Sequence, residues 1–413
     1  MLWLPGLIIL LGGLPALLRT GQVDPRGWML PALLLIPASA LLKARRGEGA
    51  AWWAGLGTVG MVLACAFLAS WRMPGLVPVA WFLSVALLGA FAGLQLGSIR
   101  ASAKEGARQL AGTALVLFAV AACWLAREPR IEPLPGARPK LAVISALPLF
   151  WKAEASGLPV PADAPIIAVL RQRFDVRPVD SPLALEKGRV KALLLAQPRA
   201  LSMDELIALD AWVRDGGIAL VLADPQLRWP MDLPLGDRRR PPAVTSLAAI
   251  IEHWRVKLAP LRQDADERRH FLGDGRMLTV YAASGFKDAG PACRILGRGL
   301  VARCMVGRGS ATIVADADLI DDRLWLADPA EPLRPDRWTA DTPQFVAQAL
   351  GAALPEGRRW VRSGEMVVGA VRWSVLIGFF WAGLGMLLFR RRQRTPFVPV
   401  TTPTIHQKPG LGD

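Results

Sequence analysis

The chain has 413 residues, of which 53% are hydrophobic and 20% are charged, and its mean hydropathy is +0.33. Soluble proteins average roughly 45–50% apolar and about 25% charged residues, so this composition argues against a wholly soluble protein. Residues 138–362 hold 32 basic and 27 acidic residues, so most of the net charge of +15 flanks apolar segments, which argues against a nucleic-acid-binding function.

Six apolar runs predict membrane-spanning helices, because crossing the hydrocarbon takes roughly 17–25 helical residues. Five lie within residues 1–126, and the sixth lies at 366–389. The first five runs are at about 2–18, 27–42, 52–71, 75–98 and 109–126. We expect the first run to be a retained helix, because it has no basic residue before its apolar core. Ionisable residues do not occur deep inside any run, which argues against a transporter pore formed by this chain alone.

Three basic clusters predict the orientation of these helices. They follow the second, fourth and sixth runs and consist of Lys43, Arg45 and Arg46; Arg100, Lys104 and Arg108; and Arg390, Arg391, Arg392 and Arg394. Basic residues accumulate on the cytoplasmic side of membrane proteins. We therefore expect a multi-pass inner-membrane protein in contact with lipid, with residues 140–363 in the periplasm and a basic, Pro-rich cytoplasmic tail at 390–413.

Residues 127–139 form a charged, Pro-rich linker, and alternating strand and helix patterns follow it. Five buried strands are expected at 140–145, 176–179, 190–196, 218–223 and 309–315. Besides a capped helix after Ser202, helices are expected at 165–174 and 245–257. Antiparallel additions to the sheet are expected at 277–283, 293–296 and 300–306. The predicted fold class is a membrane α-helical bundle plus an α/β domain, a sandwich with a mainly parallel sheet.

The clearest local pattern is a βαβ crossover. Ser202 and Glu205 form a capping box, in which each side chain binds an amide at the helix start. Gly216 and Gly217 end the helix, and the strand that follows ends in Asp224 and Pro225. Strands connected in this way run parallel.

Four carboxylates follow the last core strand: Asp316, Asp318, Asp321 and Asp322. Ligands bind outside the carboxyl ends of parallel strands, and clustered carboxylates suit Mg²⁺ or Ca²⁺. We interpret these residues as loop caps and solvated charges, with metal binding by Asp316, Asp318 and Asp322 as the alternative. Asp224 could join them, but we expect it to order the turn at Pro225.

The predicted α/β domain has two cysteines, Cys293 and Cys304. A two-residue turn at Arg298 and Gly299 would make them a hydrogen-bonded pair about 5.5 Å apart between Cα atoms, within disulfide range. Bonded and free cysteines both remain open. The sequence has no phosphate-binding loop and no Ser nucleophile elbow, and its three scattered histidines argue against a zinc site. We expect no catalytic residues and no cofactor.

Residues 193–225 (LLLAQPRALSMDELIALDAWVRDGGIALVLADP) resemble the core of the GldG-like auxiliary proteins of ABC transporters, named for gliding motility. Residues 247–254 resemble the helix that follows in those proteins, with Arg255 in place of the usual glycine, and residues 307–319 resemble a later strand. The resemblance covers roughly residues 140–350. It implies a flavodoxin-like, glutamine-amidotransferase-like sandwich anchored by a C-terminal helix.

Amidotransferases of that fold use a cysteine at a strand-to-helix elbow. The corresponding positions here, 196–198 and 223–225, contain none. The resemblance therefore implies a non-enzymatic auxiliary subunit of an ABC-type transport or motility system, with other membrane subunits and a separate ATPase chain as partners. The alternatives are a metal-dependent hydrolase using Asp316, Asp318 and Asp322, and a scaffold or sensor of an envelope-stress system.

Overall fold

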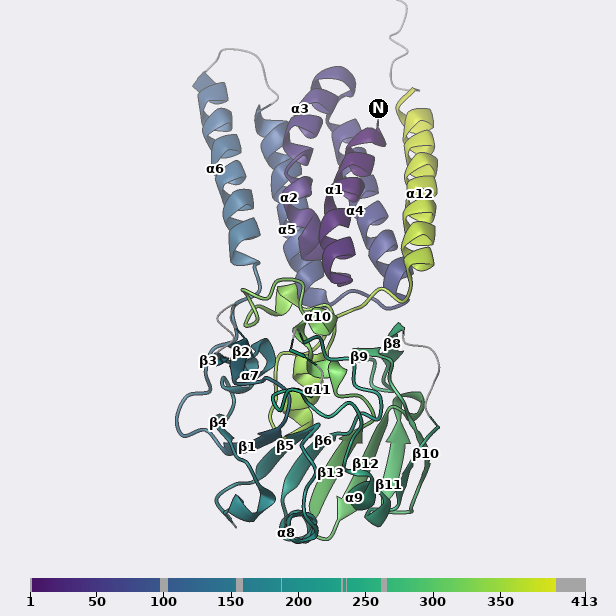
Figure 1. The fold of residues 1–413 in the computed structure, drawn as a ribbon. Coiled ribbons are helices and arrows are strands. Elements are labelled where there is room, and N and C mark those ends of the chain that lie inside the picture. Colours follow the sequence, from purple (N-terminus) through teal and green to yellow (C-terminus); the bar gives the residue numbers. More distant parts are fainter. Residues whose placement is uncertain are drawn as a thin grey trace, which may run out of the picture.

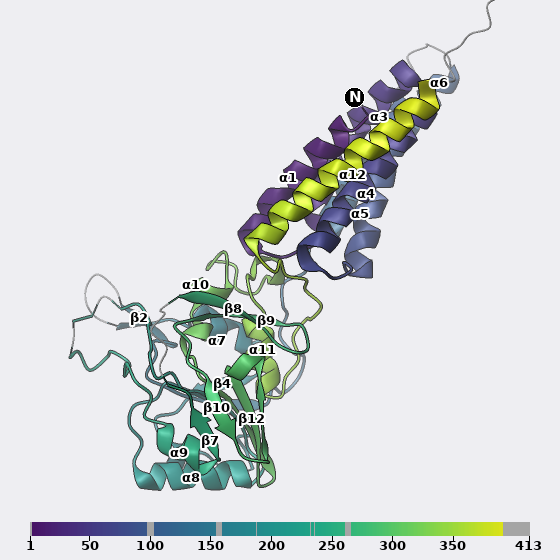
Figure 2. The same cartoon turned by 90° about the vertical axis from the view of Figure 1, so that its right-hand side faces the viewer.

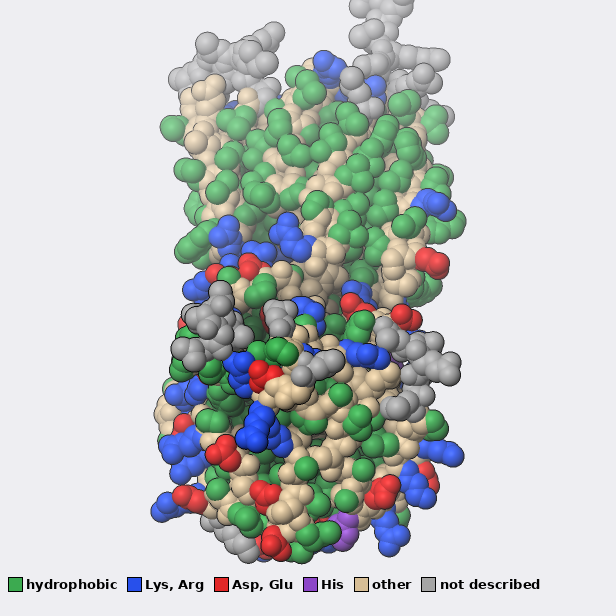
Figure 3. Space-filling view, viewed as in Figure 1, with side chains coloured by type: hydrophobic (Ala, Val, Ile, Leu, Met, Phe, Trp, Pro, Cys, Tyr) green, Lys and Arg blue, Asp and Glu red, His purple; other side chains and the backbone are tan. Residues whose placement is uncertain are grey.

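The computed structural model describes residues 2–96, 103–153, 159–186, 188–231, 233–234, 236–260 and 266–390. It consists of a bundle of apolar helices and an α/β domain at one end of that bundle (Figures 1 and 2). Arg100 and residues 391–413, which include most of the predicted tail, lie outside the described residues. Figure 3 shows mainly apolar side chains around the bundle and charged side chains over the α/β domain.

Within the described residues, four helices are long and apolar enough to cross a membrane: α4 (Glu48–Ser70), α5 (Leu76–Leu96), α6 (Ala103–Leu125, which qualifies from Gly106) and α12 (Gly364–Arg390, which qualifies to Phe389). The first predicted run is the shorter helix α1 (Leu4–Thr20). The second run is broken, because η1 (Pro25–Trp28) and α2 (Met29–Ala32) meet α3 (Leu35–Arg46) at a bend of 53°. Pro37 explains the break, since its ring excludes a helical carbonyl four residues earlier, at Leu33.

Helix α12 packs closely against α4 through Trp53 and Trp381, a contact called the tryptophan clasp. The rings of Trp53 and Trp381 stack with their centroids 4.1 Å apart. Each indole Nε1 donates to the other residue's carbonyl, at 2.9 Å in both directions. A side chain at Gly57 or Gly385 would come under 3.0 Å from these rings. Small residues allow this close approach of helices within a membrane.

The α/β domain is built on a seven-stranded sheet in the order β11-β12-β13-β6-β5-β1-β4. Five strands are mutually parallel: β1 (Lys140–Ser145), β4 (Asp175–Pro178), β5 (Ala192–Ala196), β6 (Ile218–Leu222) and β13 (Gly309–Val314). At one edge β12 (Val301–Val306) and β11 (Cys293–Leu296) add in antiparallel fashion. The predicted combination of apolar helices with a mainly parallel sheet is confirmed.

Helices cover both faces of this sheet. Helices α7 (Pro165–Leu170) and α11 (Thr342–Ala349) share one hydrophobic core with the sheet, and α8 (Met203–Arg214) and α9 (Ala248–His253) share another. Alternate residues of β1, β5 and β6 point into the two cores, as the two-residue repeat of a strand requires. Sequence patterns missed α11, which follows a run of loops.

The βαβ unit contains the capping box predicted from its sequence. Ser202 Oγ accepts a hydrogen bond from Glu205 N at 3.3 Å, and Glu205 Oε2 accepts one from Ser202 N at 2.7 Å. The two glycines differ in their role. Gly216 has the left-handed backbone, with φ at 111°. Gly217 has no positive φ, but a Cβ there would come 2.5 Å from the ring of Trp212.

Three predicted elements are corrected. The helix expected at 245–257 ends at His253, because the chain turns at Arg255 with φ at 63° and continues as β7 (Val256–Leu258), which pairs with β10 (Phe286–Ala289). The helix expected at 165–174 ends at Leu170. Strand β9 (Met277–Tyr281) pairs with β8 (Glu267–Phe271) in a separate two-stranded sheet. The first correction depends on a backbone turn without glycine and on a strand partner distant in sequence.

The bundle and the α/β domain are joined by hydrogen bonds as well as by linkers. Gln22 Nε2 donates to the carbonyls of Pro335 and Trp338, at 2.9 and 2.7 Å. Two backbone hydrogen bonds connect the same loop with the segment before α12, from Val23 N to Arg359 O (2.7 Å) and from Val361 N to Gly21 O (3.0 Å). The loop after α1 therefore binds the strand-like lead into α12.

Candidate functional site

Neighbouring strands bring three carboxylates together at the carboxyl edge of the sheet. Asp224 follows β6, Asp316 follows its parallel neighbour β13, and Asp318 begins η4 (Asp318–Ile320). They are 0%, 0% and 2% exposed, and each offers an oxygen within 4.8 Å of the others. The next helix, α10 (Asp322–Trp325), lies at the end of the α/β domain nearest the bundle in both views (Figures 1 and 2). This edge of the sheet therefore faces the membrane helices.

The set of carboxylates differs from the one expected from sequence. Asp224 orders its turn by accepting from Gln226 N at 2.7 Å, as expected, but it also belongs to the group and accepts from Ala317 N at 3.1 Å. Asp322 lies outside this group of three. Asp321 caps α10 and forms an ion pair with Arg323 at 2.6 Å. The chain turns at this cap, so that consecutive aspartates have different surroundings.

Backbone amides donate hydrogen bonds to most carboxylate oxygens of Asp224, Asp316 and Asp318. Asp316 accepts from Leu319 N at 2.8 Å and from Tyr281 N at 3.0 Å, one bond on each oxygen. Asp318 Oδ2 accepts from Arg228 N at 2.8 Å. Asp318 Oδ1 is buried and has no hydrogen-bond partner among the described residues. One oxygen of the group is thus left without a polar contact.

Burial weakens the acidity of all three groups. It raises the pKa of Asp224 to about 6 and that of Asp318 to about 7, and it raises the pKa of Asp316 well above its usual range. The neighbouring carboxylates add to the effect at Asp316 and Asp318, because like charges disfavour ionisation. The arrangement suits a bound proton or a bound cation.

A cavity of about 270 Å³ adjoins the group through Asp318 alone. Its lining residues are Arg228, Glu267, Tyr281, Asp318, Asp321, Arg323 and Leu324. Asp224 and Asp316 do not line it. Only one of the three carboxylates is therefore accessible to a small molecule from this side.

Gln197 contributes a connection that sequence reasoning did not find. It follows β5 with φ at 43° and is fully buried. Its side-chain amide donates to Asp224 O and accepts from Asp224 N, both at 2.9 Å. The side chain at this elbow position therefore holds the end of β6 in place. The signal available in the sequence is a polar glutamine directly after a buried strand.

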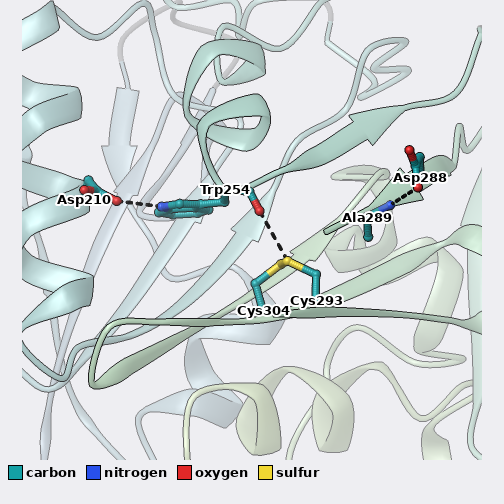
Figure 4. Close-up of a disulfide and its surroundings, with 6 residues drawn as sticks. All are labelled: Asp210, Trp254, Asp288, Ala289, Cys293 and Cys304. Atoms are coloured by element: carbon teal, nitrogen blue, oxygen red, sulfur yellow. Dashed lines mark hydrogen bonds between the residues drawn. A yellow bond between two sulfur atoms is a disulfide. The ribbon is translucent and has the colours of Figure 1, made fainter. Parts of the chain in front are cut away.

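Cys293 and Cys304 form a disulfide across β11 and β12, with their Cα atoms 4.0 Å apart (Figure 4). The predicted turn and pairing type are wrong. Leu296 and Val301 form the last pair, so four residues make the connection. The adjacent bond from Met305 N to Ala292 O makes the cysteines a non-hydrogen-bonded pair, which is the closer kind. A loop two residues longer at the same register reverses the alternation of the ladder.

We expect the double variant Cys293→Ser, Cys304→Ser to keep its cellular function and to lose about 2–4 kcal/mol of stability, because the bond constrains the unfolded chain. Equilibrium unfolding with and without reductant measures the loss. A variant that folds normally but loses function would show that these cysteines act chemically.

Residues 138–261 match the model of a protein family described as an ABC-type uncharacterized transport system. No curated protein matches the chain. Three of the similar solved structures are an exo-β-1,4-mannosidase from an Opitutaceae bacterium, a β-galactosidase from Bacillus circulans and an α-L-fucosidase from Paenibacillus thiaminolyticus.

Identity to these enzymes is 16%, 11% and 12%, with TM-scores of 0.32, 0.28 and 0.29. The matches cover 60%, 55% and 60% of this chain. They span 40%, 34% and 37% of the enzymes, and likeness at this level carries no conclusion about function. The family match is confined to residues 138–261 of the α/β domain, and the apolar helices lie outside it.

Proposed function

We propose that this chain is a non-enzymatic auxiliary subunit of an ABC-type transport or motility system, whose ATPase is a separate chain. The observation that supports this most is the family match over residues 138–261, which spans β1 to β7 and contains the whole βαβ unit. The sheet with helices on both faces fits the glutamine-amidotransferase-like sandwich that the GldG-like resemblance implies. The apolar helices add a membrane location.

The α/β domain serves as a binding domain in this proposal. At the elbow after β5, the Gln197 side chain forms hydrogen bonds with the backbone of Asp224. A metal-dependent hydrolase using Asp316, Asp318 and Asp322 has less support, because Asp322 lies outside the group and only Asp318 reaches the adjoining cavity. Hydrolysis needs a metal-bound water that meets its substrate.

The junction between the domain and the bundle gives such a subunit a means of coupling. Gln22 contacts the carbonyls of Pro335 and Trp338, and the adjoining loop pairs with the segment that leads into α12. A partner that binds the α/β domain would therefore act on α1 and α12 through hydrogen bonds. Membrane subunits that contact these two helices would receive the signal.

We place the α/β domain in the periplasm and the C-terminal tail in the cytoplasm of an inner-membrane protein. The last turn of α3, which contains Lys43, Arg45 and Arg46, and the start of α6 lie at the end of the bundle far from the α/β domain (Figure 1). Reporter fusions after Arg138 and after Arg394 should report opposite sides, outside and inside respectively. The same side for both fusions would show that the number of crossings is wrong by one.

Co-purification tests the proposed partnership. The full chain, tagged and expressed at native level, is extracted in a mild detergent, and its partners are identified by mass spectrometry. A tagged, unrelated multi-pass protein sets the background. We expect an ATPase chain and a permease to be enriched, and the proposal fails if neither is recovered under conditions that keep the chain folded.

A further inference from the structure

The three buried aspartates lack ion-pair partners among the described residues, although the nearby charges of Arg228 and Arg323 partly offset the rise in the pKa of Asp224 and Asp318. Ionised groups inside a protein are paired or coordinate a metal, because removal from water is otherwise costly. Between described residues, no ion pair joins Asp224, Asp316 or Asp318 to a lysine or arginine. Arg323, the nearest candidate in sequence, pairs with Asp321 instead.

The spacing of the three groups fits one small cation. Their candidate oxygens lie within 4.8 Å of one another. An ion bound at about 2.0–2.6 Å from each ligand, as Mg²⁺ and Ca²⁺ are, places neighbouring oxygens about 3–5 Å apart. Each carboxylate oxygen has two lone pairs, so the amide bonds to Asp224 and Asp316 leave capacity for an ion.

A second observation points to a ligand independently of this spacing. Asp318 is 2% exposed, and its Oδ1 is buried without a hydrogen-bond partner in the part of the chain that the structure describes. An unsatisfied buried acceptor is rare in native proteins and calls for a specific explanation. Asp318 also lines the 270 Å³ cavity, which offers an entry path and space for water ligands. An ion bound to this oxygen supplies its missing polar contact and also neutralises negative charge on the three carboxylates.

We propose that Asp224, Asp316 and Asp318 bind one hard divalent cation, Ca²⁺ or Mg²⁺, at the carboxyl edge of the sheet. The ion joins the ends of β6 and β13 to η4, just ahead of α10 and the junction with the bundle. Its role is structural, since two of its three protein ligands are closed off from the cavity. The ion stabilises the part of the α/β domain that faces the membrane helices.

Thermal unfolding of the full chain in detergent, after removal of metals with EDTA, tests the proposal. Saturating Ca²⁺ or Mg²⁺, added separately, should raise Tm by about 5–10 °C, and NaCl of equal ionic strength should not. The ion with the lower half-saturating concentration is the preferred one. Elemental analysis after equilibrium dialysis against that ion should find one ion per chain.

Asp318→Asn should abolish the divalent shift in Tm and the bound ion, because it removes the charge of the carboxylate whose Oδ1 has no hydrogen-bond partner, with little change in shape. Asp322→Asn is the matched control, since it alters the same segment outside the group and should keep both. Wild-type protein that binds no ion and shows no divalent shift overturns the proposal. An equal response from the Asp318→Asn variant also overturns it. Should that variant not fold, the dialysis measurement on wild type decides alone.

Discussion

Replacing Gly309 with alanine is expected to destabilise the α/β domain by about 3 kcal/mol or more, at the upper end of the effects of overpacking. Gly309 begins β13 and packs against the loop that closes α8. A Cβ there would come under 3.0 Å from the carbonyls of Val213 and Gly217 and from Gly217 N. These are backbone atoms, so no rotamer change relieves the overlap. Relief would require separating β13 from β6 or shifting the end of α8.

Chemical denaturation of the full chain in detergent, followed by tryptophan fluorescence, measures this loss. Gly273→Ala is the matched control, because a Cβ at that glycine meets nothing within 4 Å and its φ is not positive. We expect it to change stability by less than about 0.5 kcal/mol, as surface substitutions do. Equal denaturation curves for Gly309→Ala and wild type would refute the packing described for β13.

Arg358→Ala is expected to cost about 3 kcal/mol, the lower end of the cost of breaking a buried ion pair. The side chain of Arg358 is 5% exposed and lies 3.4 Å from Glu128. Its guanidinium lies over the ring of Trp338 at 4.8 Å and donates to the carbonyls of Pro335 and Pro355. Burial lowers the pKa of Arg358, but an arginine remains charged at neutral pH. The variant loses these contacts at the junction between linker, domain and bundle.

Arg130→Ala provides the comparison. Arg130 also pairs with a glutamate from a distant segment, Glu331 at 2.7 Å, but its side chain is 66% exposed. Exposed pairs contribute about 0–1 kcal/mol, so this change should be nearly silent. Limited proteolysis of the 127–139 linker, together with Tm, should separate the two variants. Equal cleavage rates and equal Tm values would show that the buried contacts of Arg358 do not hold the junction.

Local chemistry explains why some elements could be predicted. The capping box at Ser202 and the glycine stop after α8 involve residues only a few positions apart, so their pattern survives in the sequence. The strands of β1 and β13 begin where their apolar runs begin. Signals of this kind do not depend on the order of the strands.

The membership of the aspartate group depends on that order, so the sequence leaves open that Asp224 joins it and wrongly suggests Asp322. Asp224 and Asp316 meet only because β6 and β13 are neighbours in the sheet, although six strands, β7 to β12, separate them in the chain. The disulfide geometry depends on whether two or four residues connect β11 and β12, and both lengths give the same cysteine register. Arg255 shows the same limit, since it adopts a backbone conformation that its residue type does not favour.

The tryptophan clasp between α4 and α12 imposes an order on biogenesis. Helix α12 is translated last, so the groove around Gly57 on α4 lacks its partner until the ribosome has passed the whole α/β domain. During that interval lipid must fill the groove, and the indole of Trp53 has no Trp381 carbonyl to bind. Closure of the helical bundle is therefore a late step, which follows synthesis of the α/β domain. A chain truncated before residue 364 should therefore have an incomplete helical bundle even when its α/β domain has folded.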